Sequence, residues 1–260
     1  MRIAVLLKMV PDVVEDLEIA PTGKSLTGGS LHWVPNESDE HALEQALLLK
    51  ERYGATVIAL ALDAPAVDGA LFAALVKGAD RAIKITRLPA GLTSAEEADI
   101  FARVVGREIG ATPDLILTGV QAIDDLDGLI GPLIACSLGL PFLGVVVGLT
   151  RNPTGAGFLA VKECTGGIRA DFDVLPPAVI GIQASERPPR YVPVVKLQVA
   201  AQSLKVERVP APLPADPVIP LIEVLRMRKR LPAGHAEMLA GSLEQVAGRF
   251  HDVLAAQEVI

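Results

Sequence analysis

The chain has 260 residues, of which 50% are hydrophobic and 3% aromatic, and a formal net charge of −7 at pH 7. This length suits one large domain with or without an appendage, since single cores grow to about 250 residues before they split. The negative charge and the few aromatic residues argue against nucleic-acid binding. The apolar runs are shorter than the ~18 to 20 residues that cross a bilayer, so we expect no direct membrane insertion.

The first residues predict a buried strand and not an export signal. Residues Arg2–Leu7 are mostly aliphatic, as in a strand that is covered on both faces of a parallel sheet. Lys8 follows this short apolar run and no small-residue cleavage site is present, so we expect a cytoplasmic protein. Cys136 and Cys164 lack metal or redox spacing and are predicted to be buried thiols.

Strands and helices alternate along the first half of the chain. Helices are predicted over Asp39–Arg52, closed by Gly54, over Pro65–Lys77, closed by Gly78, and over Ser94–Ile109 with a Ser-Ala-Glu-Glu start. Aliphatic strands are predicted between them: Thr56–Leu62, Arg81–Ile85 and Asp114–Thr118. This alternation predicts a three-layer α/β fold, a mostly parallel sheet with helices on both faces.

From Phe142 the pattern changes. The runs FLGVVVGLT, FLAVKE, IRADFDVL and AVIGIQ are separated by turn residues and predict antiparallel additions to the same sheet. After Gln183 the chain is Pro-rich and is predicted to be irregular through Leu231. A helix over Met238–Leu254 would carry one apolar face: Leu239, Leu243, Val246, Phe250 and Val253.

These patterns predict two parts. Residues 1–200 would form an α/β nucleotide-binding domain, and residues 201–260 an extended linker with a C-terminal helical arm. An apolar helix that is separated from its domain by about fifty residues usually packs on something other than that domain's core. We therefore expect the arm to contact a partner subunit.

The loop after the fourth predicted strand, residues 119–131, lies where open parallel sheets bind ligands. Gly128 and Gly131 would let the backbone approach a ligand, and Pro132 suits the first turn of a helix. This layout suits phosphate, but an ordinary acidic loop before a helix fits the spacing equally well. Three acidic residues argue against bare phosphate unless they face ribose or solvent: Asp124, Asp125 and Asp127.

Two other patterns carry no function. Thr22–Ser25 imitates the end of a P-loop, but Glu18 stands where the first glycine of that motif belongs, so a turn between short strands is predicted. The four histidines have no partners at ligand or triad spacing, and no GxSxG or HExxH motif occurs. We therefore predict neither a metal site nor catalytic residues.

Taken as a whole, the chain resembles the beta subunit of electron-transfer flavoproteins over nearly all of its length. The resemblance lies in five ordered segments: Lys8 at the end of the first strand, Pro35–Asp39 leading into Ala42–Glu51, Gly78–Ala82, Gln121–Asp125 with Gly131-Pro132, and Pro189-Arg190-Tyr191 at the position of the partner-recognition loop of that family.

This resemblance implies a Rossmann-like, adenine nucleotide alpha hydrolase-like fold and an electron carrier subunit without catalytic residues of its own. It implies AMP on this chain, or a second FAD as in electron-bifurcating members, and an alpha subunit that holds most of the FAD. Electrons would pass from dehydrogenases to the respiratory chain. The nucleotide contacts implied by position are Leu6, Asn36, Glu37, Ser38, Asp39, Leu62, Asp63, Gly119, Gln121, Ala122, Ile123, Asp124, Asp125, Gly128, Leu129, Ile130 and Gly131.

Asn36 suits adenine or ribose in this interpretation, and the backbone of residues 128–131 suits the phosphate. Relatives place polar residues at 128–130, so here only backbone donors remain. Residues 194–200 replace a usually lysine-rich stretch after Tyr191, which implies a flavin dehydrogenase other than an acyl-CoA dehydrogenase at the loop around Pro189, Arg190 and Tyr191. Two alternatives stay open: an adenine-nucleotide-binding regulatory protein of the same fold, and a scaffold that has lost its nucleotide.

Overall fold

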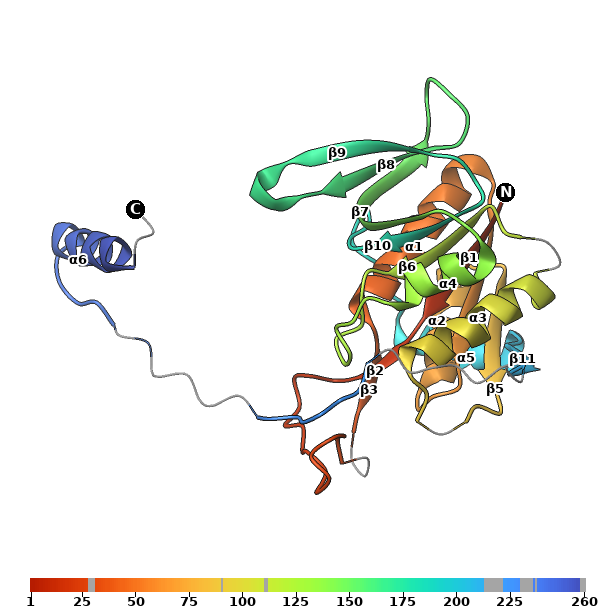
Figure 1. Cartoon of the computed structure of the whole chain (residues 1–260), viewed down its shortest axis with the longest axis horizontal. Helices are drawn as coiled ribbons and strands as arrows, with labels where there is room; N and C mark the ends of the chain where they lie inside the picture. Colours follow the sequence, from red (N-terminus) through yellow and green to blue (C-terminus); the bar gives the residue numbers. More distant parts are fainter. Residues whose placement is uncertain are drawn as a thin grey trace.

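A computed structural model describes residues 1–27, 31–89, 91–109, 112–212, 222–229, 236 and 238–257. Within these residues, nine strands form one sheet in the order β11-β5-β4-β1-β6-β10-β7-β8-β9 (Figure 1). The strands are β1 Arg2–Leu7, β4 Thr56–Leu62, β5 Arg81–Thr86, β6 Leu115–Gly119, β7 Phe142–Arg151, β8 Phe158–Glu163, β9 Arg169–Val174, β10 Ala178–Ile182 and β11 Glu207–Pro210.

Helices cover this sheet, and a small hairpin stands beside it (Figure 1). The helices are α1 Glu37–Tyr53, α2 Val67–Lys77, α3 Ser94–Glu108, α4 Ile130–Leu138, α5 Val194–Ser203 and α6 Leu243–Ala256, with a 3-10 turn at Thr165–Gly167. The hairpin pairs β2 Met9–Pro11 with β3 Trp33–Pro35 in antiparallel register. No helix in the described part of the chain is both long and apolar enough to cross a membrane.

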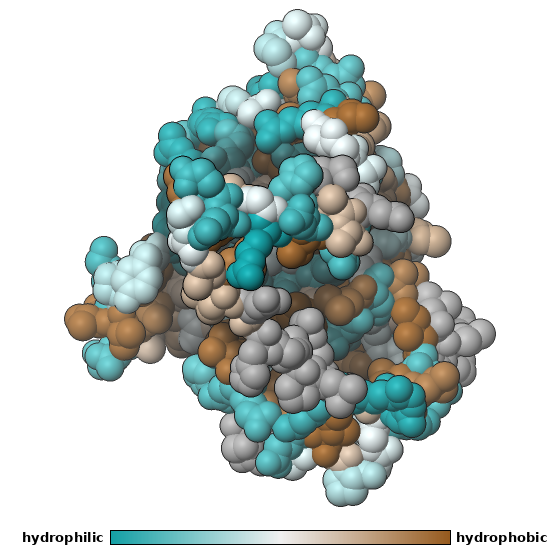
Figure 2. All heavy atoms as spheres, turned by 90° about the vertical axis from the view of Figure 1, so that its left-hand side faces the viewer, coloured by the Kyte–Doolittle hydropathy of each residue, from teal (hydrophilic) through white to brown (hydrophobic). Residues whose placement is uncertain are grey.

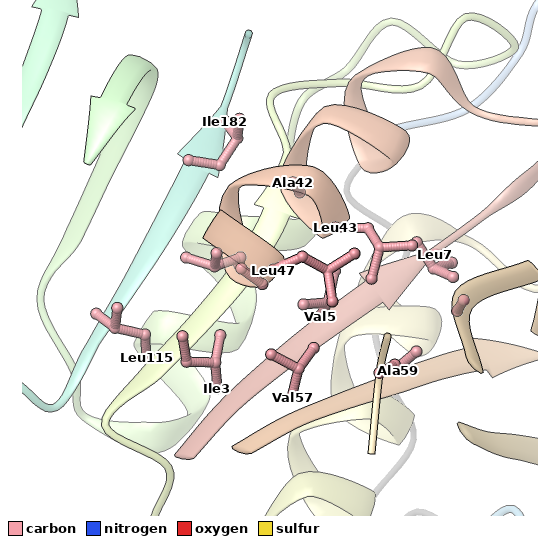
Figure 3. Close-up of a cluster of buried hydrophobic side chains, with 14 of the residues drawn as sticks. Ile3, Val5, Leu7, Ala42, Leu43, Leu47, Val57, Ala59, Leu115 and Ile182 are labelled. Atoms are coloured by element: carbon pink, nitrogen blue, oxygen red, sulfur yellow. The ribbon is translucent and has the colours of Figure 1, made fainter. Parts of the chain in front are cut away.

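The sheet has a hydrophobic layer on each face because its central strands are apolar at nearly every buried position. In β1, Ile3 and Val5 pack toward one cluster, which includes Leu47 of α1 (Figure 3). Ala4 and Leu6 point to the opposite cluster, which includes residues of α3 and α4. Helices on both faces of a mostly parallel sheet confirm the predicted three-layer α/β class.

Several predicted boundaries are confirmed. β1 and β4 have the predicted bounds, and α1 and α2 end at Gly54 and Gly78, where φ is +67° and +123°. Helix α3 begins at Ser94 as predicted and ends at Glu108, one residue before the predicted end. Its N-cap is Thr93 and not Ser94, because Thr93 and Glu96 form the capping box. Thr93 and Ser94 are each followed three residues later by a glutamate, so both match the Ser/Thr-x-x-Glu pattern of a capping box and the sequence alone does not choose between them.

The prediction that all strands after Phe142 join antiparallel is wrong for β10 and for β7, which joins the sheet by parallel pairing with β10. Strand β10 lies between β6 and β7 and runs parallel to both, while β8 and β9 are antiparallel as predicted. All five residues of β10 are buried, as a central strand requires. The hydrophobic pattern of a sequence predicts that such a strand exists but not which strands it pairs with.

The stretch predicted to be irregular after Gln183 contains α5 and β11, so that prediction is wrong there; its end at Leu231 lies outside the described residues. β11 pairs with β5 at the edge of the sheet, a position that tolerates its terminal Pro210. α5 spans residue 200, where the boundary between the two parts was predicted. The division into two parts stays a prediction.

Two further details differ from the sequence prediction. Cys136 and Cys164 are free and exposed, so the prediction of buried thiols is wrong. The C-terminal helix starts at Leu243 and not at Met238, because Ser242 and Gln245 form a capping box. This helix, α6, lies apart from the sheet, and on the face of the molecule that carries it hydrophobic and hydrophilic groups are interspersed (Figures 1 and 2).

Candidate functional site

The strand order places a crevice at the ends of β1 and β6. From β1 the chain proceeds to β4 and β5 on one side and then returns to β6 on the other. Parallel sheets bind ligands at the carboxyl ends of strands at such a switch point. A cavity of about 1320 Å³ lies here, lined by residues at the ends of both strands, including Lys8 and Gly119.

Asp39, in the first turn of α1, joins the two strands at this crevice. Its Oδ2 accepts a hydrogen bond from the backbone N–H of Lys8 at 2.8 Å, and its Oδ1 accepts one from Gly119 at 2.8 Å. Burial raises the pKa of Asp39 to about 7, although both N–H groups favour the ionised form. A side chain at residue 119 would collide with Ser38 and Asp39, so glycine is required at this position.

Lys8 offsets part of the negative charge of the acidic loop after β6. Its Nζ lies 2.6 Å from Asp125 Oδ2 and 3.0 Å from Asp124 Oδ1. Burial lowers the pKa of Lys8, but Glu97, Asp124 and Asp125 outweigh it and raise the pKa above its ordinary value. Lys8 therefore offsets one of the negative charges of the loop, which reduces the repulsion that a phosphate would meet there.

The α4 N-terminus forms one end of the cavity. Gly128, with φ of +62°, precedes the helix, and the Asp127 carboxylate accepts hydrogen bonds from the Leu129 N–H at 2.9 Å and from the Ser94 hydroxyl. First-turn N–H groups of a helix lack partners within it and favour anions. A phosphate at this end would share the helix terminus with Asp127.

Thr118 is a site residue that the sequence interpretation missed. Its side chain is 2% exposed, it lines the cavity, and its Oγ1 is the one buried side-chain polar atom in the described residues without a hydrogen-bond partner. A Cβ added to Gly131 of α4 would lie 3.0 Å from this oxygen. A buried hydroxyl without a hydrogen bond destabilises a protein by about 1 to 3 kcal/mol. A ligand that forms a hydrogen bond with this hydroxyl would remove that cost and bind more tightly. The only signal in the sequence was one hydroxyl in the aliphatic run of β6.

The structure brings most of the predicted contact residues together. All line the cavity except Glu37, Ser38 and Ile123. Asn36 is buried, and its amide nitrogen donates to Ser38 Oγ and to the Gln121 carbonyl, both at 3.0 Å. Its contact with adenine or ribose stays a prediction, since these bonds already use the amide to hold the loop after β6.

Other cavity residues come from parts of the chain that the sequence did not connect with a ligand. The β2-β3 hairpin contributes Met9 and Trp33, and the segment before α3, together with the first turn of that helix, contributes residues 87–89 and 91–95. Ile222, Glu223 and Val224 line the same cavity although they are about a hundred residues beyond the loop after β6. No local pattern marks them, because their placement depends on tertiary contacts.

Arg190, predicted to belong to a partner-recognition loop, points into this protein. Its guanidinium contacts Glu44 Oε1 at 2.8 Å and Glu51 Oε1 at 2.7 Å, and its Nη1 lies 3.3 Å from the Lys77 carbonyl. Tyr191, by contrast, is 82% exposed. Arg190 therefore anchors the segment that precedes α5, while Tyr191 is free to meet a partner.

No group of three or more His, Cys, Asp or Glu side chains in the described ranges is arranged to hold a metal ion. The features that remain are a large cavity at the switch point, a helix N-terminus and an unpaired hydroxyl. Together they fit an organic ligand with an anionic group.

Comparison with known proteins gives consistent results. The family model described as "Electron transfer flavoprotein domain" matches residues 29–214. "Electron transfer flavoprotein subunit beta" of Methylophilus methylotrophus is 28% identical over 261 residues, 98% of each chain. "Protein FixA" of Azorhizobium caulinodans is 32% identical over 71% of this chain and 67% of its own. "Acryloyl-CoA reductase electron transfer subunit gamma" of Anaerotignum propionicum is 30% identical over 74% of this chain and 71% of its own.

Proposed function

Because the chain belongs to the electron transfer flavoprotein domain family, we propose that it is a beta-type electron transfer subunit that binds AMP. It pairs with an alpha subunit that carries FAD, and the pair moves electrons from a dehydrogenase toward the respiratory chain. The names of the relatives from Methylophilus and Anaerotignum, which both specify electron transfer, support this role.

The observation that carries the nucleotide proposal is the cavity between β1 and β6 with Thr118 in its wall. The phosphate of AMP fits the N-terminus of α4, where the first-turn N–H groups lack partners within the helix and the Thr118 hydroxyl has no hydrogen-bond partner. Lys8 offsets one of the two charges of Asp124 and Asp125 beside this position. The nucleotide then holds the ends of β1 and β6 together from within the cavity.

This chain contributes no catalytic residue in the proposal. FAD on the alpha subunit supplies the redox chemistry when bound, and the beta-type chain walls that cofactor on one side. The α6 helix is the contact to the alpha subunit, because none of its residues is buried and its apolar side chains include Leu243, 82% exposed, and Phe250, 54% exposed. A cytoplasmic location stays a prediction.

The donor dehydrogenase is proposed to dock at Tyr191 and α5. Helix α5 packs beside α2 and leaves a shallow apolar hollow of about 330 Å³ that Val76, Val195 and Val199 help to line. Val195 and Val199 are 69% and 60% exposed. An apolar docking surface in place of a lysine-rich one favours a flavin dehydrogenase other than an acyl-CoA dehydrogenase.

The cavity volume favours a second candidate ligand. At about 1320 Å³ it exceeds the roughly 300 to 1,000 Å³ of most small-molecule sites, which leaves room for a dinucleotide such as FAD. In that case this chain carries the second FAD of a bifurcating pair.

Acid extraction of the purified chain, followed by chromatography, tests these proposals. We expect about one AMP per chain and a colourless protein, with yellow flavin absorbance only after co-expression with an alpha subunit. Stoichiometric FAD on the isolated chain would replace the AMP proposal by the bifurcating one. Absence of any bound nucleotide, together with no binding of added AMP or FAD, would refute the nucleotide proposal and favour a scaffold.

A further inference from the structure

Residues 222–229, here called the strap, follow the domain in sequence but lie against its N-terminal lobe, residues 12–27. The Met227 N–H donates to the Gly23 carbonyl at 2.7 Å. Lys24 Nζ lies 2.8 Å from Glu223 Oε1, and Lys229 Nζ lies 2.8 Å from Asp16 Oδ1. Three contacts spread along seven residues fix both the position and the direction of the strap on the lobe.

The lobe is built into the frame of the ligand cavity. Its start is tied by the Asp12 N–H to the His32 carbonyl at 2.9 Å, and its interior by the Thr27 N–H to the Glu18 carbonyl at 2.8 Å. The lobe connects β2 to β3, whose Met9 and Trp33 line the cavity. Any segment that binds the lobe is therefore held beside the ligand site.

The strap itself forms part of the cavity wall. Ile222, Glu223 and Val224 line the cavity, and the side chains of Ile222 and Val224 are 54% and 46% exposed. Leu225, their neighbour, is 77% exposed and does not line the cavity. The strap thus turns two aliphatic side chains toward the ligand site and leaves them incompletely covered.

The aliphatic and acidic side chains of this wall indicate which part of a ligand would contact it. Covering an aliphatic side chain with a flat apolar surface is favourable, by about 25 cal/mol for each Å² removed from water. A phosphate beside the Glu223 carboxylate would gain nothing and would be repelled. The ring system of a nucleotide or flavin suits this wall, while its phosphate suits the N-terminus of α4.

We propose that the strap is a ligand-contacting part of the nucleotide site: Ile222 and Val224 cover the ring system of the bound nucleotide, and the nucleotide in turn holds the strap against the lobe. This inference rests on the proposed function, because it needs a nucleotide in the cavity. It adds a wall from the C-terminal part of the chain to a site otherwise formed by the first 131 residues.

Dissociation of AMP, or of FAD if that is the ligand found, tests the contact. Val224→Ser should release the probe about fivefold faster than the wild type, because its aliphatic contact is lost. Leu225→Ser is the matched control in the same segment and should keep the wild-type rate. Glu223→Lys should also speed release, and a second change, Lys24→Glu, should restore the rate by re-forming the ion pair with reversed charges.

Hydrogen exchange at the Met227 amide gives a second readout that does not depend on redox activity. Saturating AMP should slow exchange of this amide at least about fivefold if the nucleotide holds the strap on the lobe. A wild type that binds AMP or FAD but shows no change at Met227, with wild-type release rates in Val224→Ser and Glu223→Lys, overturns the strap and leaves the proposed function intact. A wild type that binds neither probe refutes the proposed function and the strap with it.

Discussion

Asp39 Oδ1 lies 2.8 Å from the backbone nitrogen of Gly119, although the two residues are 80 positions apart in the chain. The other oxygen of the same carboxylate accepts the Lys8 N–H, so one side chain at the start of α1 sets the relative position of β1 and β6. These two strand ends form the floor of the ligand cavity. The glycine at residue 119 is required by this structural contact, and its position beside the cavity is a consequence of the contact.

Replacing Glu97 by Gln should change how stability depends on pH. Burial raises the pKa of Glu97 to about 7, from an ordinary value of 4.5, and the Asp124, Asp125 and Asp127 carboxylates add to the shift against the opposing effect of Lys8. The folded protein therefore holds this proton more tightly than the unfolded chain. Its contribution to stability is full below pH 4.5 and is lost as the pH rises toward 7, by about 3 kcal/mol in total.

Urea unfolding between pH 4.5 and 7.5 measures this effect. The unfolding free energy of Glu97→Gln should fall over that range by about 3 kcal/mol less than that of the wild type. Glu163→Gln, at the exposed end of β8, is the matched control and should follow the wild-type curve. Parallel curves for wild type and Glu97→Gln would contradict the assignment.

Thr118→Val should have opposite effects on the empty and the loaded protein. Without a ligand, removal of an unpaired buried hydroxyl should raise the unfolding free energy by about 1 kcal/mol. With AMP present, loss of the hydrogen bond should weaken binding roughly fivefold to tenfold. Thr118→Ser keeps the hydroxyl and should keep the affinity. A loss of stability in the nucleotide-free Val variant would show that the hydroxyl already has a partner, such as water.

Gly131→Ala should destabilise the fold through Phe142 and not through the ligand. An added Cβ would lie 2.7 Å from Phe142 Cε2, so the ring must shift, at a cost of about 1 to 2 kcal/mol. The double variant Gly131→Ala/Phe142→Leu should recover most of this loss. Gly106→Ala in α3, where nothing lies within 4 Å, is the control and should gain about 0.5 to 1 kcal/mol. Equal loss in single and double variants would exclude Phe142 as the cause.

The sequence predicted those elements whose signals are local. β1 and β4 are mostly aliphatic, and α1 and α2 end at glycines that take positive φ, so both kinds of element could be predicted from the sequence. α5 was missed because its Val-rich sequence has no strong helical preference, and its helix is stabilised by packing on α2.

The residues of the candidate site also fall into those with a local sequence signal and those without one. The loop between Gly119 and Gly131 was found from glycine spacing after a predicted strand, which is a local signal. Thr118 could not be found, because its missing hydrogen-bond partner is a property of the packed core. The strap was missed because its contacts join residues about two hundred positions apart, as between Lys24 and Glu223.

Arg190→Met should destabilise the protein, whereas Tyr191→Ser should not. The Glu44 side chain is 4% exposed, and loss of Arg190 leaves its carboxylate buried without its main partner, at a cost of about 2 to 4 kcal/mol. Tyr191 is 82% exposed, so its removal should change stability by less than about 0.5 kcal/mol. Unfolding in urea measures both, and Glu44→Gln should recover part of the loss in an Arg190→Met background. Wild-type stability of Arg190→Met would refute its role as an anchor.

The last prediction concerns α6 and the alpha subunit. Phe250 and Val253 lie three residues apart, are 54% and 51% exposed, and share the helix face that also carries the half-buried Val246 and Leu254. Burial of this face against a partner would gain about 1.5 to 3 kcal/mol for each large side chain. The double change Phe250→Ser/Val253→Ser should therefore raise the dissociation constant of the heterodimer at least about tenfold, and deletion of residues 236–260 should raise it further.

Isothermal titration with the purified alpha subunit measures this constant. His251→Ser/Asp252→Ser, on the polar side of the same helix, is the matched control, because these side chains are 70% and 85% exposed and belong to no apolar cluster. The capping box of Ser242 and Gln245 is intact in both variants, so helix formation is not the quantity that differs. If the apolar double variant binds the alpha subunit as tightly as the control does, α6 is not the contact, and the interface must lie on the domain itself.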